Sequence, residues 1–291
     1  MRTLSDHESR VTSHQSRRPR GFTLIEMIVV ITITGIIAAG VAMFIRRPVE
    51  GYVDAARRAE LSDIADTALR RMTRDLRTAL PNSVRLTTTG AGATTVFYLE
   101  YLQTSGGGRY RAELPAVPAG ENILDFTVAD SQFDVIGPMP TLAVGDSIVI
   151  YNLNSSGAAA NAYSGANRAA YSSNTLTTIT LTAATLFPFT SPGKRFQVVQ
   201  YPVTYECNPV AQVLRRYWNY TIAAAQPTPT TGSPPAGAGT AQALLATNVT
   251  GCTFTYTEVT QRSGLLALIL QVSRDGETVR LFQEAHVNNV P

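Results

Sequence analysis

The chain has 291 residues with 44% apolar side chains, which is enough for a globular core in one or two domains. All of its net charge of +3 comes from residues 1–21, which hold five arginines against two acidic residues. The rest carries equal numbers of basic and acidic side chains, so composition excludes the broad basic surface of a nucleic-acid-binding protein.

The N-terminal region joins a basic segment to a long apolar run. Arg17, Arg18 and Arg20 are followed by residues 22–45, whose single charge is Glu26. About 24 residues in a helix can span a hydrocarbon core of roughly 30 Å. The run is too long for the apolar core of a cleaved secretory signal, which has roughly 7–15 residues. A transmembrane helix is therefore expected, and a plain signal anchor is one reading of it.

The junction before this run carries a more specific signal. Residues 21–26 read Gly-Phe-Thr-Leu-Ile-Glu, which resembles the class III signal of type IV pilins and type II secretion pseudopilins. The resemblance implies that a prepilin peptidase removes residues 1–21 as a leader and that Phe22 becomes the methylated N-terminus. It also implies that Glu26 meets the Phe22 amine of a neighbouring subunit, and that the chain is not the tip-most subunit, which typically lacks this acid.

The same resemblance implies a location and a set of partners. It predicts a single-pass inner-membrane protein with a cytoplasmic N-terminus and a periplasmic C-terminal domain, which later enters a pilus or pseudopilus. Arginines on the N-terminal side of the run favour this orientation, although Arg46 and Arg47 at its other end weaken the bias. The expected partners are other minor and major pilins, the prepilin peptidase and the inner-membrane assembly platform, with no nucleic acid.

Residues 46–80 predict an amphipathic helix. Arg46, Arg47, Pro48 and Gly51 are expected to interrupt or kink the chain, because proline removes a helical hydrogen bond. Apolar residues then recur three and four apart from Leu61 onward, and charged residues occupy the opposite face. The apolar face is expected to pack on the following domain, and the helix is expected to end before a proline at residue 81.

From residue 84 the apolar pattern has a period of two, which indicates an antiparallel β-rich domain over residues 81–291. Residues 266–273 and 278–287 predict a hairpin around Asp275-Gly276. The other expected strands are residues 94–102, 123–128, 147–152, 175–182, 195–206, 213–220 and 252–259. Gly106, Gly107 and Gly108 are interpreted as a turn, and residues 152–174 and 225–241 as loops, the second a mobile Pro/Gly insertion. The expected fold class is α+β, a long N-terminal helix packed on this domain.

Two cysteines, Cys207 and Cys252, form an isolated pair in a chain expected to be exported, which favours a disulfide. A metal site is the alternative, but no histidine lies nearby in sequence. Asp125, Asp130 and Asp134 lack the spacing of a calcium loop and are interpreted as solvated loop acids. No catalytic residues, no metal site and no cofactor are expected.

The order of parts resembles the J-type minor pseudopilins, and short segments resemble proteins of mannose-sensitive haemagglutinin (MSHA) pilus biogenesis. These segments are residues 52–56, 79–85, 216–218 and 286–291. The resemblance implies a structural, non-enzymatic minor pilin that helps assemble a type IV pilus or type II secretion pseudopilus near its tip. The alternative is a filament-tip adhesin or binding module that uses loops 152–174 and 225–241.

Overall fold

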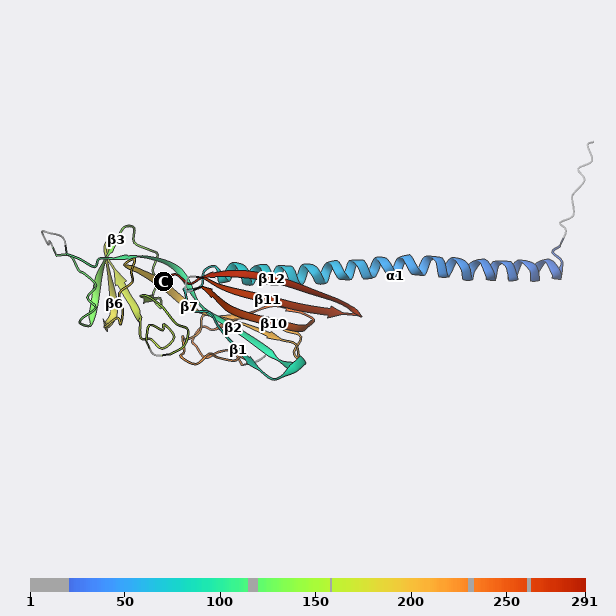
Figure 1. The fold of residues 1–291 in the computed structure, drawn as a ribbon. Helices are drawn as coiled ribbons and strands as arrows, with labels where there is room; N and C mark the ends of the chain where they lie inside the picture. The colour runs from blue at the N-terminus through green and yellow to red at the C-terminus, as the bar shows by residue number, and fades with distance from the viewer. Residues whose placement is uncertain (1–20, 115–119, 158, 230–232, 261–262) are drawn as a thin grey trace, which may run out of the picture. The chain divides into compact units, whose positions relative to one another are not determined.

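The computed structural model describes residues 21–114, 120–157, 159–229, 233–260 and 263–291, and the chain divides into two compact units after Asp54. Its fold is α+β: one long N-terminal helix, followed by an antiparallel β-rich domain (Figure 1). The predicted fold class is therefore confirmed. The two units are described separately below.

Helix α1, Leu24–Leu76, is continuous, and Pro48 lies inside it. An interruption at residues 46–51, one of the two predicted outcomes, is therefore wrong, and a kink there stays a prediction. A proline inside a helix removes one N–H donor, while the bonds on either side of it remain available. Arg46 and Glu50 also face each other one turn apart, with Nε 2.7 Å from Oε1, across the proline.

In the second unit, α1 buries a stripe of apolar side chains, as their three- and four-residue spacing predicts. The stripe consists of Leu61, Ala65, Ala68, Leu69, Met72 and Leu76. The helix ends at Leu76, four residues before the predicted end. Beyond it the backbone bonds to the sheet instead: the Leu80 amide donates to the Leu102 carbonyl at 2.8 Å, and the Thr104 amide donates to the Thr78 carbonyl at 2.9 Å.

The described strands form two antiparallel sheets. The nine-stranded sheet has the order β1-β2-β3-β6-β5-β4-β7-β8-β9, with an added β2–β7 pairing, and the three-stranded sheet has the order β10-β11-β12. The strands are β1 Arg85–Thr89, β2 Val96–Tyr110, β3 Asp130–Ile136, β4 Ser147–Val149, β5 Arg168–Asn174, β6 Thr178–Thr185, β7 Arg195–Asn208, β8 Val213–Trp218, β9 Ala241–Thr247, β10 Val249–Thr260, β11 Ser263–Arg274 and β12 Glu277–Asn288, and a short 3₁₀ helix occupies Gly92–Thr94.

Most of the predicted strands overlap observed ones, and the hairpin around Asp275-Gly276 is confirmed. Arg274 pairs with Glu277 across a two-residue turn, whose central residues have φ of 51° and 86°. The strand predicted over residues 123–128 is wrong. Asp125 turns the chain there by accepting bonds from the Thr127 amide and hydroxyl, both at 2.7 Å.

Two predicted loops contain regular structure. Strand β5 occupies the end of the loop predicted over residues 152–174. Gly106–108, predicted as a turn, lie inside β2 opposite β7. A Cβ on Gly107 would lie 2.6 Å from the Phe196 carbonyl oxygen, and one on Gly108 would lie 2.8 Å from the Phe196 ring. Glycine is therefore required here by close packing, and not by a turn.

Several residues of the insertion at residues 225–241 bond to the domain. Gln226 donates to the Tyr98 carbonyl at 2.9 Å, and the Thr221 amide donates to the Ala236 carbonyl at 3.3 Å. A Cβ on Gly237 would approach the Tyr220 Cα to 2.8 Å. These contacts place parts of the insertion against the domain, and its mobility stays a prediction. Residues 230–232 lie outside the described part.

The largest core of the second unit lies between the helix stripe and both sheets. Its members come from α1, β2, β7 and β8 and from all three strands β10, β11 and β12 (Figure 1). A second apolar cluster, with Phe133, Ile148 and Phe196 among its members, joins β3 to β7. The first core thus brings together the last strands of the chain and the C-terminal part of α1.

Candidate functional site

The predicted processing site lies just before α1. Gly21, Phe22 and Thr23 precede the helix, and a Cβ on Gly21 would meet no other heavy atom within 4 Å. Phe22 is exposed. The Gly21–Phe22 peptide bond is therefore non-helical and accessible, as a peptidase substrate must be.

Glu26 and Thr23 form a reciprocal cap on the helix. The Glu26 amide donates to Thr23 Oγ1 at 3.3 Å, and the Thr23 amide donates to Glu26 Oε2 at 3.4 Å. This is a capping box, which satisfies two of the amides that every helix N-terminus leaves unpaired. The carboxylate also lies at the positive end of the helix dipole.

Sequence reasoning missed Thr23, although its signal is present: Thr23 and Glu26 have the S/T-x-x-E spacing of a capping box. Glu26 therefore has a local role in starting the helix besides the intersubunit role that the resemblance implies. Because the cap needs only an acceptor oxygen at residue 26, a glutamine can supply it. The intersubunit role needs a negative charge.

Cys207 and Cys252 form a disulfide that joins β7 to β10, and so links the two sheets. The prediction from the isolated pair is confirmed, and the alternative of a metal site formed by these thiols is excluded. Asp134, predicted to be a solvated loop acid, is instead buried in β3, where it accepts a bond from Thr178 Oγ1 at 2.7 Å. Sequence alone could not show that the strand carries it inward.

Several charges of α1, assigned by periodicity to a solvent face, bond to the β domain. Glu60 accepts two bonds from Arg274, and Arg58 Nε donates to Glu277 Oε2 at 2.7 Å. These contacts lower the pKa of both carboxyls. They fix the tip of the β11–β12 hairpin on the helix, together with Arg57 and Asp275, whose Nη2 and Oδ2 are 3.6 Å apart.

Asp75 forms a second link between the helix and the sheet. It accepts bonds from the Tyr205 hydroxyl at 2.7 Å and from Arg216 Nε at 2.9 Å, and Arg71 Nε lies 3.0 Å from its other oxygen. The Arg216 guanidinium lies over the Trp218 ring, 4.6 Å from its centroid. Buried charges of this kind are stable only when they are paired and hydrogen-bonded.

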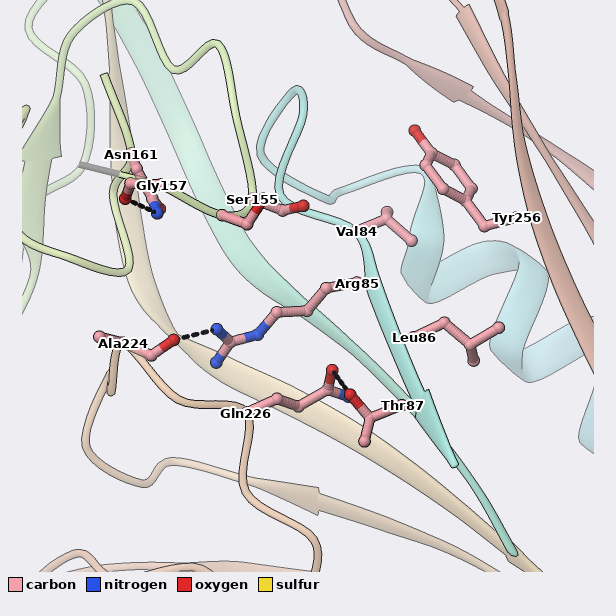
Figure 2. Close-up of a pocket in the computed structure, with 11 residues that line it drawn as sticks. Val84, Arg85, Leu86, Thr87, Ser155, Gly157, Asn161, Ala224, Gln226 and Tyr256 are labelled. Carbon is pink, nitrogen blue, oxygen red and sulfur yellow. Dashed lines mark hydrogen bonds between the residues drawn. The ribbon is translucent and has the colours of Figure 1, made fainter. Parts of the chain in front are cut away.

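The second unit contains a pocket of about 580 Å³ beside β1 (Figure 2). It brings together parts of both loops predicted as binding loops. Ser155, Ser156, Gly157 and Asn161 come from the first, Gln226 comes from the second, and Val84, Arg85, Leu86, Thr87, Ala224 and Tyr256 complete the lining. The volume lies within the range of about 300–1,000 Å³ usual for ligand pockets.

Arg85, which lines this pocket, is held in place by several contacts. Its Nε donates to Glu100 at 2.6 Å, and its Nη atoms donate to the Ala224 and Ala223 carbonyls at 2.6 and 3.0 Å. The guanidinium also lies 3.6 Å from the Tyr163 ring centroid. Burial raises the pKa of the Glu100 carboxyl above its usual value, and the bond from Arg85 opposes that rise.

Residues 16–42 match the family model of the prokaryotic N-terminal methylation motif. No curated protein and no solved structure matches the chain. Within the described residues, α1 is the one helix long and apolar enough to cross a membrane. The methylation motif and this helix together support a type IV pilin-like protein, anchored in the membrane by a single pass.

Proposed function

We propose that the chain is a structural minor pilin or pseudopilin of the J type, most like the MshO protein of MSHA pilus biogenesis. In this proposal it enters the inner membrane with a cytoplasmic N-terminus and a periplasmic β domain. The prepilin peptidase cuts it between Gly21 and Phe22, and Phe22 is methylated. It then takes a position just below the tip of a type IV pilus or type II secretion pseudopilus.

The observation that carries this proposal is the combination of features at the start of α1. An accessible Gly21–Phe22 bond precedes a capped Glu26, and the apolar side chains after it are exposed along residues 22–45. Such a surface is stable in lipid, or against other apolar helices. A carboxylate within it favours a cationic partner, because an isolated charge is costly in an apolar medium.

The proposed assembly step follows from this surface. Cleavage would create an amine at Phe22, and a filament would exchange lipid contacts along residues 22–45 for contacts with neighbouring helices. Pairing Glu26 with the amine of another subunit would neutralise both charges as they leave water. Other minor and major pilins are then the partners of the helix, and the assembly platform drives their insertion.

Processing can be tested by Gly21→Leu. A bulky side chain should block cleavage by the peptidase, and intact mass of the protein from its native host should then show a retained leader. Gly40→Leu is the matched control, because it changes a glycine inside the apolar run and should leave cleavage intact. A wild-type chain that still starts at Met1, or that is cut after Ala42, would contradict the proposed site.

Assembly can be tested by comparing Glu26→Leu with Glu26→Gln. Glutamine keeps an acceptor oxygen for the cap and removes the charge, so both variants should insert and be processed but fail to crosslink to other minor pilins. Glu50→Leu, on an exposed part of the same helix, is the control. If Glu26→Gln assembles like the wild type, Glu26 acts through the cap and the intersubunit pairing is wrong.

A binding module is the second candidate, and the pocket beside β1 favours it. That pocket combines residues 155–157 and 161 with Gln226, as a site formed by loops 152–174 and 225–241 would. A tip position would expose such a pocket to an external partner. If a substitution that fills the pocket neither impairs assembly nor abolishes binding of any ligand, only the structural role remains.

A further inference from the structure

The pocket in Figure 2 follows the backbone edge of β1. Four consecutive residues, Val84, Arg85, Leu86 and Thr87, line it. Successive side chains of a strand point to opposite faces, and Figure 2 shows Arg85 and Leu86 pointing in different directions. A pocket on a single face would contact alternate residues only, so this pocket lies along the strand edge.

This edge carries backbone groups available for pairing. Among the described strands, β1 pairs with β2 alone, and it is the first strand of the nine-stranded sheet. Its five pairs with β2 are regular, without a bulge, and its sequence contains neither lysine nor proline. Bulges, lysine and proline are three of the features that protect an edge strand, and β1 has none of these three, although it is short and carries Arg85.

Among the described strands, the other sheet edges carry bulges or charges of their own. β10 has register shifts between Val249 and Gly251 and between Glu258 and Thr260. β9 has a register shift opposite Leu214 and Arg215, and β12 carries Arg280 and Glu284 on its exposed side. On β1 the exposed end consists of Thr88 and Thr89. At the pocket, this edge is flanked by Ser155, Gln226 and Tyr256, which come from three separate segments.

We propose that the pocket binds an extended, uncharged peptide segment of a partner protein, which adds a strand to the free edge of β1. Backbone hydrogen bonds supply the affinity in this mode, and flanking pockets supply the specificity. The proposal gives a ligand class to the binding-module candidate and does not depend on assembly into a filament.

The charge state of the lining favours an uncharged peptide. Arg85 is the one charged residue among those that line the pocket, and its Nε and both Nη atoms already bond to Glu100, Ala224 and Ala223. Asn161 is likewise committed, with Nδ2 donating to Gly157 and Oδ1 accepting from Tyr163. A charged ligand would therefore find no free counter-charge, whereas the β1 backbone can pair with any peptide backbone.

The test uses full-length protein in detergent micelles and a displayed library of random seven-residue peptides. Peptides enriched on the wild type are synthesised, and their Kd values are measured by fluorescence anisotropy. Ser156→Trp fills the pocket from an exposed lining residue and should weaken binding at least tenfold. Ser172→Trp, at an exposed position outside the lining, should bind like the wild type.

Backbone chemistry provides a second readout. N-methylation of single peptide residues should abolish binding at every second position. Only alternate amides of an added strand point toward β1 and can donate to it. Hydrogen–deuterium exchange should slow at residues 85–89 when peptide is bound. Each of these results is independent of whether Glu26 supports assembly, so the two proposals can fail separately.

Four outcomes would overturn the proposal: no enrichment above Ser156→Trp, binding that tolerates methylation at every position, binding that salt abolishes, and protection at β12 in place of β1. Self-association that Ser156→Trp removes would also count against it, because the occupant would then be a second copy of this chain.

Discussion

The two units place their apolar and charged side chains in opposite ways. Along residues 22–45 the large apolar side chains are exposed, with Ile36 at 73% and Phe44 at 81%. The second unit has a core of buried apolar side chains and, with them, Glu100 and Glu206, both fully buried. Each of these carboxylates has partners: Arg85 and Tyr220 bond to Glu100, and Tyr217 and Asn208 bond to Glu206.

This difference shows which unit can be stable by its own contacts. The second unit gives the buried Glu100 and Glu206 internal partners, joins its two sheets with a disulfide and covers the helix stripe. Residues 22–45 have no such contacts in the described structure, so their stability depends on an apolar environment outside the chain. Substitutions should therefore change the unfolding of the second unit strongly when they fall within it, and weakly when they fall in the first.

The largest effect should come from removing the disulfide. Cys207→Ser with Cys252→Ser opens a loop of 45 residues, and the chain-entropy estimate gives a loss of about 4 kcal/mol. Urea unfolding can be followed by the fluorescence of Trp218, the single tryptophan. A loss below about 1 kcal/mol would mean that the two sheets are held together without the bridge.

A matched pair on α1 tests the comparison directly. Leu69→Ala removes a buried side chain in the second unit and should cost about 3 kcal/mol. Ile37→Ala makes a similar truncation at an exposed position and should leave the Trp218 transition unchanged. If Ile37→Ala shifted that transition by a similar amount, the two units would not be energetically separate.

Arg85→Met should cost about 3 kcal/mol at pH 7, because it leaves the buried Glu100 carboxylate without its cation. Burial already raises the pKa of Glu100 above 4.5, and loss of Arg85 raises it further. A carboxyl whose pKa is higher in the folded state stabilises the fold fully at pH values below its unfolded-state pKa. This stabilisation is lost as the pH rises through the folded-state pKa. The variant should therefore lose least near pH 4 and most at pH 7.

The control for this prediction is Glu100→Gln in the Arg85→Met background, which removes the ionisable group. Its stability difference from Glu100→Gln alone should no longer grow from pH 4 to pH 7. The measurement is the urea midpoint at each pH. An effect of Arg85→Met that is constant with pH would assign the loss to packing on Tyr163 and to the bonds to Ala223 and Ala224.

Local patterns were sufficient where a single segment determined the structure. The stripe from Leu61 to Leu76 followed from helical spacing, the β11–β12 hairpin followed from Asp275-Gly276, and the disulfide followed from an isolated cysteine pair. Pro48 misled because its penalty is local, and the helix continues on both sides of it.

The rest depends on partners distant in sequence. β1 is mostly threonine, and its strand state comes from pairing with β2. Gly106–108 have no side chains to show a period, and only β7 explains them. Residues 225–229 look like a linker but bond to the Tyr98 carbonyl through Gln226. At the candidate site, Gly21, Phe22 and Glu26 could be selected from the motif. The edge of β1 could not, since no local signal marks which strand lies at the edge of a sheet.

The core of the second unit also determines when during synthesis the helix can be covered. Leu61, Leu69 and Met72 share a core with β11 and β12, which are synthesised about 200 residues later. The nascent chain therefore carries an incompletely covered apolar helix face until its last strand leaves the ribosome. Apolar surface exposed in this way favours aggregation before folding is complete.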